Sequence, residues 1–345
     1  MAMENPRADG FAMPAESAPH QATLMAWPAR VDLWGAMLDR AKDEWAAVAR
    51  AVAAYEPVTM VCPPGASREV GDRCGAGVEP LELPIDDSWM RDNGPIFVRN
   101  ERGEVALVHF RFNSWGQKYL PYDKDARVPA LLASHFGVRR YEAPFVLEGG
   151  SFFVDGEGTL LTTEQCLLHP NRNPSMSRDE IEDGLRWFLG VDDVIWLPHG
   201  LVEDRDTDGH VDGLAQFVRP GVVMLSVAAG DGDPNAPRFD EDRKLLEGVR
   251  DARGRRFEVM DGPVNAWVDL EGVGPTVIPY MNHYLANGGV IVPVGDIPGD
   301  TVALDLLSKA YPDREVIGVP GAMISFGGGG PHCITQQVPA GSFVG

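Results

Sequence analysis

Residues 147–163, LEGGSFFVDGEGTLLTT, contain the clearest structural pattern in the sequence. The carboxylic acid Glu148 stands just before an apolar run at 152–154, and a second apolar run returns at 160–163. Between the runs lies DGEG, residues 155–158, whose glycines suit a tight reversal of the chain. Two short apolar runs around such a turn are typical of a β-hairpin. The stretch therefore predicts a hairpin with a polar residue at its start.

The same arrangement recurs along the chain. The other instances are Asp92 before 95–110, His210 and Asp212 before 214–227, the stretch 280–294 around Asn287-Gly288-Gly289, and Cys333 before the last strand. Helix-like stretches with helical spacing of apolar residues lie at 30–55, 126–136, 178–189, 240–250 and 301–311. Strand-and-helix units of this kind bury their apolar faces against their neighbours.

We therefore expect one α/β domain of about five strand-and-helix units around an axis, a propeller-like arrangement in which the hairpin starts meet at the axis. The alternatives are a three-layer α/β sandwich and ordinary α+β connectivity. Residues 1–10 are expected to form a flexible N-terminus and residues 11–345 a single domain.

Composition limits the classes of partner. Acidic residues outnumber basic ones 51 to 30, and the formal net charge of −21 repels phosphate backbones and anionic lipids. No run approaches the roughly 20 apolar residues of a membrane span, and the polar start lacks the apolar core of a signal peptide. We expect a cytoplasmic protein without nucleic-acid or membrane partners, while assembly into a homo-oligomer is left open.

The cysteines single out one candidate nucleophile. The four of them, at positions 62, 74, 166 and 333, form no Cys-x-x-Cys pair, which argues against a disulfide framework and a structural zinc site. Only Cys333 follows a glycine run, 327–330, which indicates a close approach of the main chain. A phosphate cradle would need a nearby cation and a following helix, whereas 334–338 has a strand pattern. A buried, space-filling cysteine is the alternative, and it fits Cys62 and Cys166 well.

A thiol nucleophile needs a partner that moves protons, and His210 is the best candidate. Strand alternation places His210 and Asp212 on one face, so both can enter one pocket. The flanking acids Asp206 and Asp208 also set it apart from a merely structural histidine, which is the ordinary alternative.

Two further carboxylates favour a cationic ligand. Asp92 and Glu148 each stand beside an apolar strand, where an unpaired charge is costly. A salt bridge to a structural Arg is the alternative for Glu148, and simple core packing is the alternative for Trp89. Because carboxylates pair with the planar guanidinium group, a thiol, an imidazole and several acids together indicate a guanidinium site. A zinc site competes, but the single His-x-Asp is a weak match to zinc-ligand spacing, so no metal is expected.

Motifs between residues 13 and 339 resemble the agmatine deiminases, a family of the guanidine-modifying pentein superfamily. The shared stretches are MPAE (13–16), DSWMRDNGP (87–95), LEGG (147–150), LTTE (161–164), NRNP (171–174), TDGHVD (207–212), NGG (287–289) and HCITQQ (332–337). The resemblance implies a five-bladed α/β propeller without metal or organic cofactor. It also implies a hydrolase that converts agmatine to N-carbamoylputrescine and ammonia, within polyamine metabolism and putrescine biosynthesis.

The resemblance implies a role for each residue of the core site. Cys333 would attack the guanidinium carbon and form a covalent thiouronium intermediate. His210 would protonate the departing ammonia and then activate water. Asp92 and Asp212 would hold the guanidinium nitrogens, and Glu148 would orient His210.

The resemblance also implies two substrate contacts, and the chain departs from the family pattern at two places. By the same resemblance Trp89 would line the pocket, and Asp206 would be a further contact to the small cationic guanidino substrate. The family usually has Asn-Ile where this chain has Gly330-Pro331, and the segment after Trp115 is shorter than usual. A deiminase of another small guanidino compound and an amidinotransferase therefore stay open, and a non-catalytic binding propeller is the alternative of a different class.

Overall fold

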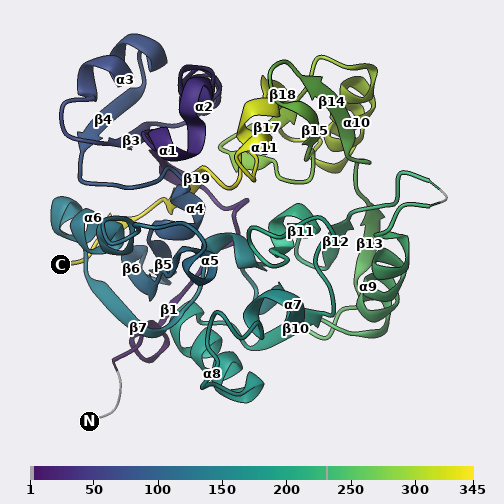
Figure 1. The fold of residues 1–345 in the computed structure, drawn as a ribbon. Coiled ribbons are helices and arrows are strands. Elements are labelled where there is room, and N and C mark those ends of the chain that lie inside the picture. Colours follow the sequence, from purple (N-terminus) through teal and green to yellow (C-terminus); the bar gives the residue numbers. More distant parts are fainter. Residues whose placement is uncertain (1–3, 231) are drawn as a thin grey trace.

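The computed structural model of the protein describes residues 4–230 and 232–345. Its fold is mixed α/β, as the sequence predicts. In these ranges it contains five sheets of at least three strands and one two-stranded sheet. Figure 1 shows the sheets around the middle of the molecule, with the helices α6, α8, α9 and α10 towards the outside.

Each of the five larger sheets contains the same three-stranded motif. Its first strand pairs antiparallel with the second, and the second pairs parallel with the third. The motif consists of β5 (Ile96–Asn100), β6 (Glu104–Arg111) and β7 (Arg140–Val146); β8 (Phe152–Val154), β9 (Thr159–Thr163) and β10 (Asp193–Leu197); β11 (Ala215–Arg219), β12 (Val222–Leu225) and β13 (Glu258–Asp261); β16 (Tyr284–Ala286), β17 (Gly289–Val294) and β18 (Glu315–Pro320); and β19 (Thr335–Pro339), β2 (His20–Ala26) and β3 (Val58–Cys62). The four predicted hairpins are therefore confirmed. Closure of the five sheets into a propeller stays a prediction.

The remaining strands extend these sheets or form the small one. They are β1 (Phe11–Ala12) and β20 (Ser342–Phe343) beside β5 and β6, β4 (Val78–Glu82) beside β3, and the hairpin of β14 (Ala266–Leu270) and β15 (Gly274–Ile278). Because β19 pairs with β2, the two ends of the chain share one sheet, and Cys333 stands just before that sheet's last strand in sequence.

The longer helices lie where the apolar spacing predicts them, with one exception. They are α2 (Leu38–Ala53), α6 (Val128–Phe136), α8 (Arg178–Leu189), α9 (Ala236–Gly248) and α10 (Pro298–Ala310). The single helix expected over 30–55 is instead divided into α1 (Val31–Trp34), a 3-10 turn and α2, because Gly35 takes a φ of 49° that is incompatible with a continuous helix. The shorter helices are α3 (Ser67–Cys74), α4 (Met90–Asn93), α5 (Ser114–Gln117), α7 (Glu164–Leu167) and α11 (Ala322–Phe326).

Helix α2 shows how the apolar stripe joins neighbouring units. Its residues Trp45, Val48 and Val52 are fully buried, and α2 packs against β17 and β18 as well as β3 and β4. Burial of each such side chain contributes about 1.5–3 kcal/mol, so this helix ties two sheets together.

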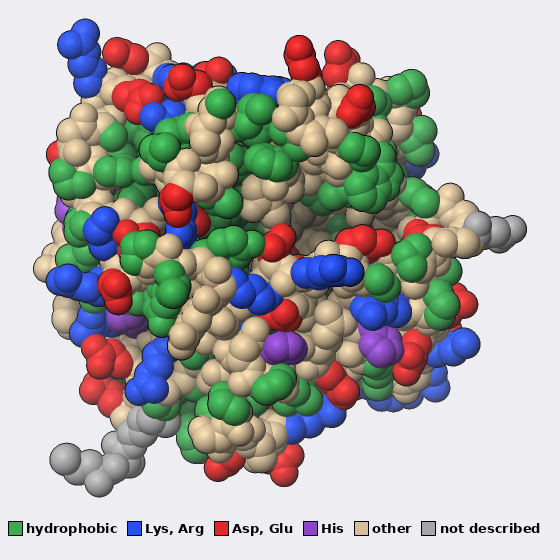
Figure 2. All heavy atoms as spheres, in the orientation of Figure 1, with side chains coloured by type: hydrophobic (Ala, Val, Ile, Leu, Met, Phe, Trp, Pro, Cys, Tyr) green, Lys and Arg blue, Asp and Glu red, His purple; other side chains and the backbone are tan. Residues whose placement is uncertain are grey.

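The surface and the N-terminus add two observations. On the face shown in Figure 2, basic side chains lie scattered among acidic and apolar ones. Over residues 4–230 and 232–345, no helix has both the length and the apolar character needed to cross a membrane. Residues 1–3 of the expected flexible segment lie outside the described residues, and Pro6–Asp9 form a 3-10 helix, so the division at residue 10 stays a prediction.

Candidate active site

The starts of three strands bring four candidate residues together. Asp92 lies in α4 ahead of β5, His210 and Asp212 lie around the 3-10 turn Val211–Gly213 ahead of β11, and Cys333 precedes β19. All four are buried, with exposed fractions of 5%, 3%, 3% and 6% in that order. Sγ of Cys333 donates to Oδ2 of Asp212 at 3.4 Å. Nδ1 of His210 lies 3.9 Å from Oδ1 of Asp92.

Gly150, in the turn Gly149–Ser151 ahead of β8, faces the same space. Its N–H donates to Oδ1 of Asp92 at 2.9 Å. A Cβ atom here would lie 2.7 Å from Nδ1 of His210, 2.8 Å from Oδ2 of Asp212 and 2.9 Å from Oδ1 of Asp92. Any side chain at this position would therefore occupy the space between the imidazole and the two carboxylates.

The two aspartates differ in their electrostatic surroundings. Burial raises the pKa of Asp92, although the charge of His210 and a 2.9 Å hydrogen bond from Nε1 of Trp115 to Oδ2 act to lower it. Burial also acts to raise the pKa of Asp212, but the hydrogen bond and charge of His332 outweigh it, and this pKa lies below its usual value. Asp212 is thus the more firmly ionised of the pair.

The same carboxylates set the protonation of the thiol and the imidazole. Burial raises the pKa of Cys333 well above its usual value, and the charges of Asp212 and Asp92 raise it further. Burial acts to lower the pKa of His210, but the charge of Asp92 prevails and this pKa lies well above its usual value. In the protein without substrate these shifts favour the neutral thiol of Cys333 and the imidazolium form of His210.

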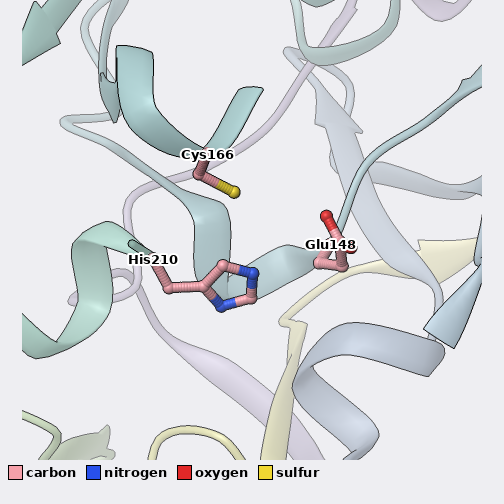
Figure 3. Close-up of side chains that lie close together, drawn as sticks. All are labelled: Glu148, Cys166 and His210. Atoms are coloured by element: carbon pink, nitrogen blue, oxygen red, sulfur yellow. The ribbon is translucent and has the colours of Figure 1, made fainter. Parts of the chain in front are cut away.

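Glu148 lies beside His210 but is hydrogen-bonded to another residue. Its Oε1 accepts from Nε of Arg172 at 2.6 Å, and both side chains are fully buried. Its Oε2 and both ring nitrogens of His210 have no hydrogen-bond partner, so the residues do not form the hydrogen bond by which Glu148 would orient His210. Figure 3 shows Glu148, His210 and Cys166 close together. The ion pair expected as the alternative for Glu148 is present, and its orienting role stays a prediction.

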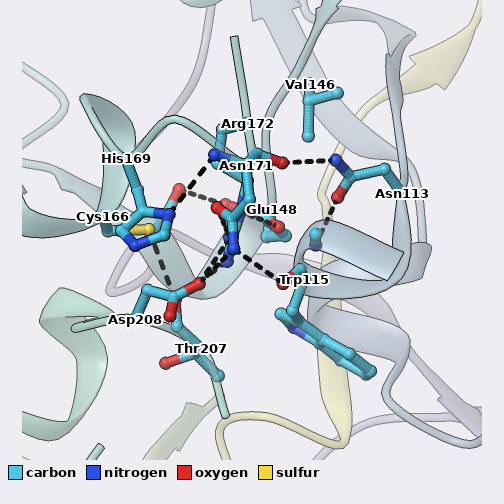
Figure 4. Close-up of polar contacts among 12 residues, drawn as sticks. Asn113, Trp115, Val146, Glu148, Cys166, His169, Asn171, Arg172, Thr207 and Asp208 are labelled. Atoms are coloured by element: carbon cyan, nitrogen blue, oxygen red, sulfur yellow. Dashed lines mark hydrogen bonds and ion pairs between the residues drawn. The ribbon is translucent and has the colours of Figure 1, made fainter. Parts of the chain in front are cut away.

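Figure 4 shows how Arg172 connects Glu148 to the segment before His210. Nη1 of Arg172 lies 2.7 Å from Oδ2 of Asp208, and Nη2 donates to the carbonyl oxygen of Thr207 at 2.8 Å. Asn171 also donates to Asp208, at 2.9 Å. This partly buried network holds residues 207–208, which stand just before His210 in the chain.

An opening beside Cys333 is lined by Trp89, Asp92, Trp115, Tyr119 and Asp206. The Trp89 side chain also contacts Trp45 edge to face, with 5.6 Å between ring centroids. Trp89 therefore both lines the pocket and packs in the core. Asp206 is exposed at the mouth, where its Oδ1 accepts from the Tyr119 hydroxyl at 2.6 Å. A wider groove elsewhere, lined among others by Leu201, Phe239 and Trp267, contains none of the candidate residues.

The glycine run before Cys333 permits close packing at the thiol. A Cβ at Gly329 would lie 2.7 Å from the Trp89 ring and 2.9 Å from Sγ of Cys333. A Cβ at Gly330 would lie 2.7 Å from Oδ1 of Asn282, the atom that accepts from the Cys333 N–H at 3.3 Å. The close approach predicted from the glycines is therefore confirmed.

The sequence matches known deiminases over nearly its whole length. The family model of the Porphyromonas-type peptidyl-arginine deiminases matches residues 12–339. The agmatine deiminase of Ectopseudomonas mendocina is 45% identical over 358 residues, which cover 97% of each chain. That of Pseudomonas aeruginosa is 44% identical with the same coverage. The chain belongs to the agmatine deiminase family.

Solved agmatine deiminases have the same fold. The enzyme of Enterococcus faecalis, described as catalysing its reaction, superposes with a TM-score of 0.93 at 34% identity and 99% coverage of both chains. A cysteine-to-serine variant of the C. jejuni enzyme with substrate bound gives a TM-score of 0.87 at 25% identity, covering 96% of this chain and 97% of that one. The resemblance inferred from the motifs is thereby confirmed.

In this agmatine deiminase family member, sequence reasoning missed the residues that hold Asp212. Nδ1 of His332 contacts Oδ2 of Asp212 at 2.9 Å, and Nε2 contacts Oε2 of Glu16 at 2.9 Å. The pKa of His332 is raised because Glu16 and Asp212 outweigh burial and the charge of Arg91, so both ring nitrogens can donate. Against burial, His332 and Arg91 lower the pKa of Glu16 to about 2. Both residues lie inside motifs of the family, MPAE and HCITQQ, but no spacing pattern connects two motifs so far apart in the sequence.

Proposed function

We propose that the protein hydrolyses the guanidinium group of agmatine to N-carbamoylputrescine and ammonia. The observation that carries the proposal is the joint burial of two carboxylates, an imidazole and a thiol, Asp92, Asp212, His210 and Cys333, in one small space. Two carboxylates offer acceptors on both sides of a planar guanidinium. Membership of the agmatine deiminase family supports the same substrate.

Binding of the substrate would itself prepare the nucleophile. The charges of Asp212 and Asp92 add to burial in raising the pKa of the Cys333 thiol. A guanidinium cation held between them offsets those charges and favours the thiolate, which is the reactive form of cysteine. The thiol proton leaves to solvent as the cation enters, and an equivalent proton later converts the released ammonia to ammonium.

The chemistry then follows from the two proton states of His210. The thiolate of Cys333 attacks the guanidinium carbon, and the His210 imidazolium donates a proton to the departing nitrogen as the C–N bond breaks. Ammonia leaves and a thiouronium remains. Neutral His210 then takes a proton from water, the hydroxide adds to the same carbon, and the C–S bond breaks as the ureido carbonyl forms, with the proton of the added hydroxyl passing to the departing sulfur to restore the thiol. The charge balances because a guanidinium and water give a neutral ureido group and an ammonium ion.

The surrounding residues would shape the pocket. Trp89 would contact the flat face of the guanidinium or the alkyl chain, and Asp206 at the mouth would attract the distal ammonium group. Glu148 would act on His210 through its charge and through the Arg172 network, since it makes no hydrogen bond to the ring. No metal or organic cofactor has a step in this scheme.

The experiment is a panel of small guanidino compounds incubated with the purified protein, with ammonia and ureido product measured for each. Agmatine should give both products. Cys333→Ser should lose several orders of magnitude in turnover, as expected when a covalent nucleophile is removed. Amidino transfer to an added amine without ammonia would favour an amidinotransferase, and turnover of another guanidine in preference would move the substrate. Binding without any turnover would favour a non-catalytic propeller.

We further propose that the five larger sheets are the blades of a propeller within one catalytic domain, residues 11–345. The repeated antiparallel-then-parallel motif and the convergence of strand starts on one buried space support this arrangement. A cytoplasmic location and a contribution to putrescine formation complete the proposal, and localisation of a tagged protein together with polyamine levels in a deletion strain test them.

A further inference from the structure

A second cluster of potential ligands adjoins the proposed catalytic site without including its nucleophile. One ligand atom each from Glu148, Cys166 and His210 lie within 4.8 Å of one another. All three residues are buried, with exposed fractions of 0%, 0% and 3%. Figure 3 shows them approaching from different parts of the fold, with Cys166 on α7. Over residues 4–230 and 232–345, no other group of three such side chains meets the same spacing.

The cluster holds buried polar atoms that make no hydrogen bond, although Nδ1 of His210 lies 3.9 Å from Oδ1 of Asp92. Oε2 of Glu148 and both ring nitrogens of His210 are buried and make no hydrogen bond. Such atoms are costly to bury unless they meet a partner. The substrate contacts assigned above use Asp92, Asp212 and Cys333, so they leave Oε2 of Glu148 and the ring nitrogen of His210 nearest to it available to another ligand.

The ligand chemistry identifies the partner. A thiolate, an imidazole and a carboxylate together form the mixed S, N and O set that suits zinc, and three protein ligands leave a fourth position open. We propose that Glu148, Cys166 and His210 bind one Zn²⁺ ion. In a tetrahedral site the ligand atoms lie about 3.3–3.7 Å apart, so a separation near the 4.8 Å limit would have to contract by about 1 Å or slightly more. The Cys166 thiol proton and one ring proton of the His210 imidazolium leave to solvent on binding, and the Zn–S bond replaces the contact of Sγ with the carbonyl oxygen of Thr207, now 3.6 Å long.

The neighbouring charges are compatible with a bound dication. Arg172 is the nearby cation, but it is ion-paired with both Glu148 and Asp208, at 2.6 and 2.7 Å. Its bond to Oε1 of Glu148 leaves Oε2 for the metal and fixes the orientation of the carboxylate, as outer partners of metal ligands commonly do. Asp92, 3.9 Å from Nδ1 of His210, adds negative charge on the other side of the ring.

The consequence for turnover rests on the proposed function. A metal bound to His210 occupies a ring nitrogen and fixes the imidazole, so the residue no longer exchanges protons with the leaving group or with water. Zinc would therefore inhibit the enzyme through a site that includes Cys166 and excludes Cys333. This differs from a cofactor, because removal of the ion leaves the enzyme active.

The decisive experiment detects the thiolate bond directly and needs no turnover. The full-length protein is stripped with a chelator, titrated with Co²⁺ alone, and its thiolate-to-cobalt charge-transfer absorption is recorded. Competition by Zn²⁺ then gives the zinc affinity. The variants are Cys166→Ser, Cys333→Ser and, as the matched control, Cys62→Ser, which changes another fully buried cysteine outside the cluster. Thermal unfolding of each variant establishes that it is folded.

We expect the band at one ion per chain in the wild type, in Cys62→Ser and in Cys333→Ser. It should vanish in Cys166→Ser, with zinc affinity reduced at least about 100-fold, since loss of even an outer partner costs 10–100-fold. Absence of the band from the wild type would overturn the proposal. So would a band that persists in Cys166→Ser and disappears in Cys333→Ser, which would place the metal at the nucleophile.

Inhibition provides the second readout. Chelator-treated protein should keep its activity, and added Zn²⁺ should inhibit the wild type and Cys62→Ser at concentrations that match the binding titration. If zinc binds as proposed but the guanidino panel shows no turnover, the site stands and the proposed function fails. If turnover is found and the cobalt band is missing, the reverse holds.

Discussion

Replacing Trp115 by phenylalanine removes one hydrogen bond of the guanidinium site, and the same substitution elsewhere controls for the smaller ring. Nε1 of Trp115 donates to Oδ2 of Asp92 at 2.9 Å, and the Gly150 N–H donates to the other oxygen. Phenylalanine keeps a smaller aromatic ring near Phe112, whose ring centroid lies 5.2 Å from that of Trp115, and it removes the Nε1–H donor together with part of the indole ring. A hydrogen bond to a charged group contributes about 1.5–3 kcal/mol, so kcat/KM for agmatine should fall about 10- to 150-fold.

The pH dependence of this variant tests the cause. The Trp115 hydrogen bond lowers the pKa of Asp92, which burial raises above its usual value. Without the donor the pKa of Asp92 rises further. Because only the ionised carboxylate binds guanidinium, the acid limb of the pH profile of kcat/KM should move to higher pH. Ammonia release measured across pH with limiting agmatine gives both the size of kcat/KM and the position of the acid limb of its pH profile.

The matched control is Trp196→Phe, which removes a 2.8 Å bond from Nε1 to Glu182 in the core beside α8. It should lower the melting temperature without moving the acid limb. An unmoved acid limb in Trp115→Phe, or an equal loss of kcat/KM in Trp196→Phe, would refute the assignment of Trp115 to Asp92.

Three further predictions concern the site, stability and substrate. Gly150→Ala should lower kcat at least about 100-fold, because its Cβ would lie 2.7 Å from Nδ1 of His210. Circular dichroism should show that the variant is folded, and near-wild-type turnover would contradict the close approach of Gly150 to His210 and the two aspartates. The pKa of Asp125 is raised to about 7, chiefly by burial, so its contribution to stability is present below the usual value of 3.8 and is lost as pH rises towards 7. Asp125→Asn keeps an acceptor for the N–H groups of Asp86 and Asp87 and should stabilise the protein at pH 8 by about 1–4 kcal/mol in denaturant unfolding, with little gain near pH 4; equal stability at both pH values would contradict it. The ratio of kcat/KM for agmatine to that for arginine should exceed one and fall with added salt, and a ratio at or below one would reveal a carboxylate clamp.

The hairpins were predictable because their determinants are local. Apolar runs on either side of a glycine turn, as in residues 152–163, specify strand, reversal and strand within a dozen or so residues. The prediction of one helix over 30–55 was wrong at Gly35. The apolar spacing continues on both sides of this glycine, but its positive φ interrupts the helix. Spacing reports which face is apolar, and the backbone conformation of a single residue decides whether the helix continues.

The candidate site was predictable only in part, for a different reason. Asp92, His210, Asp212 and Cys333 each stand at a strand start, and that shared position anticipated their meeting. The bond between His332 and Glu16 joins residues 316 positions apart, and no local pattern links them. Glu148 shows the limit of charge reasoning, because a buried carboxylate requires a cation, and sequence alone does not say whether a substrate or Arg172 supplies it.

The charges around the pocket decide which guanidine fits. Free arginine carries a carboxylate that needs a cationic partner. Arg91 is 2% exposed and contacts Glu16 and Gln337, at 3.5 and 2.8 Å, while Arg172 is 4% exposed and paired with Glu148 and Asp208.

Nearer the mouth of the pocket the cations are engaged as well. Lys118 lies 2.7 Å from Asp208 and donates to the Asp206 carbonyl oxygen at 2.8 Å, and Arg30 lies 3.5 Å from Asp87. A carboxylate entering here would compete with ion pairs already made, whereas an ammonium group would meet the exposed carboxylate of Asp206. The pocket thus favours a guanidine whose far end is cationic, because its acids are available to a ligand and its bases are already paired.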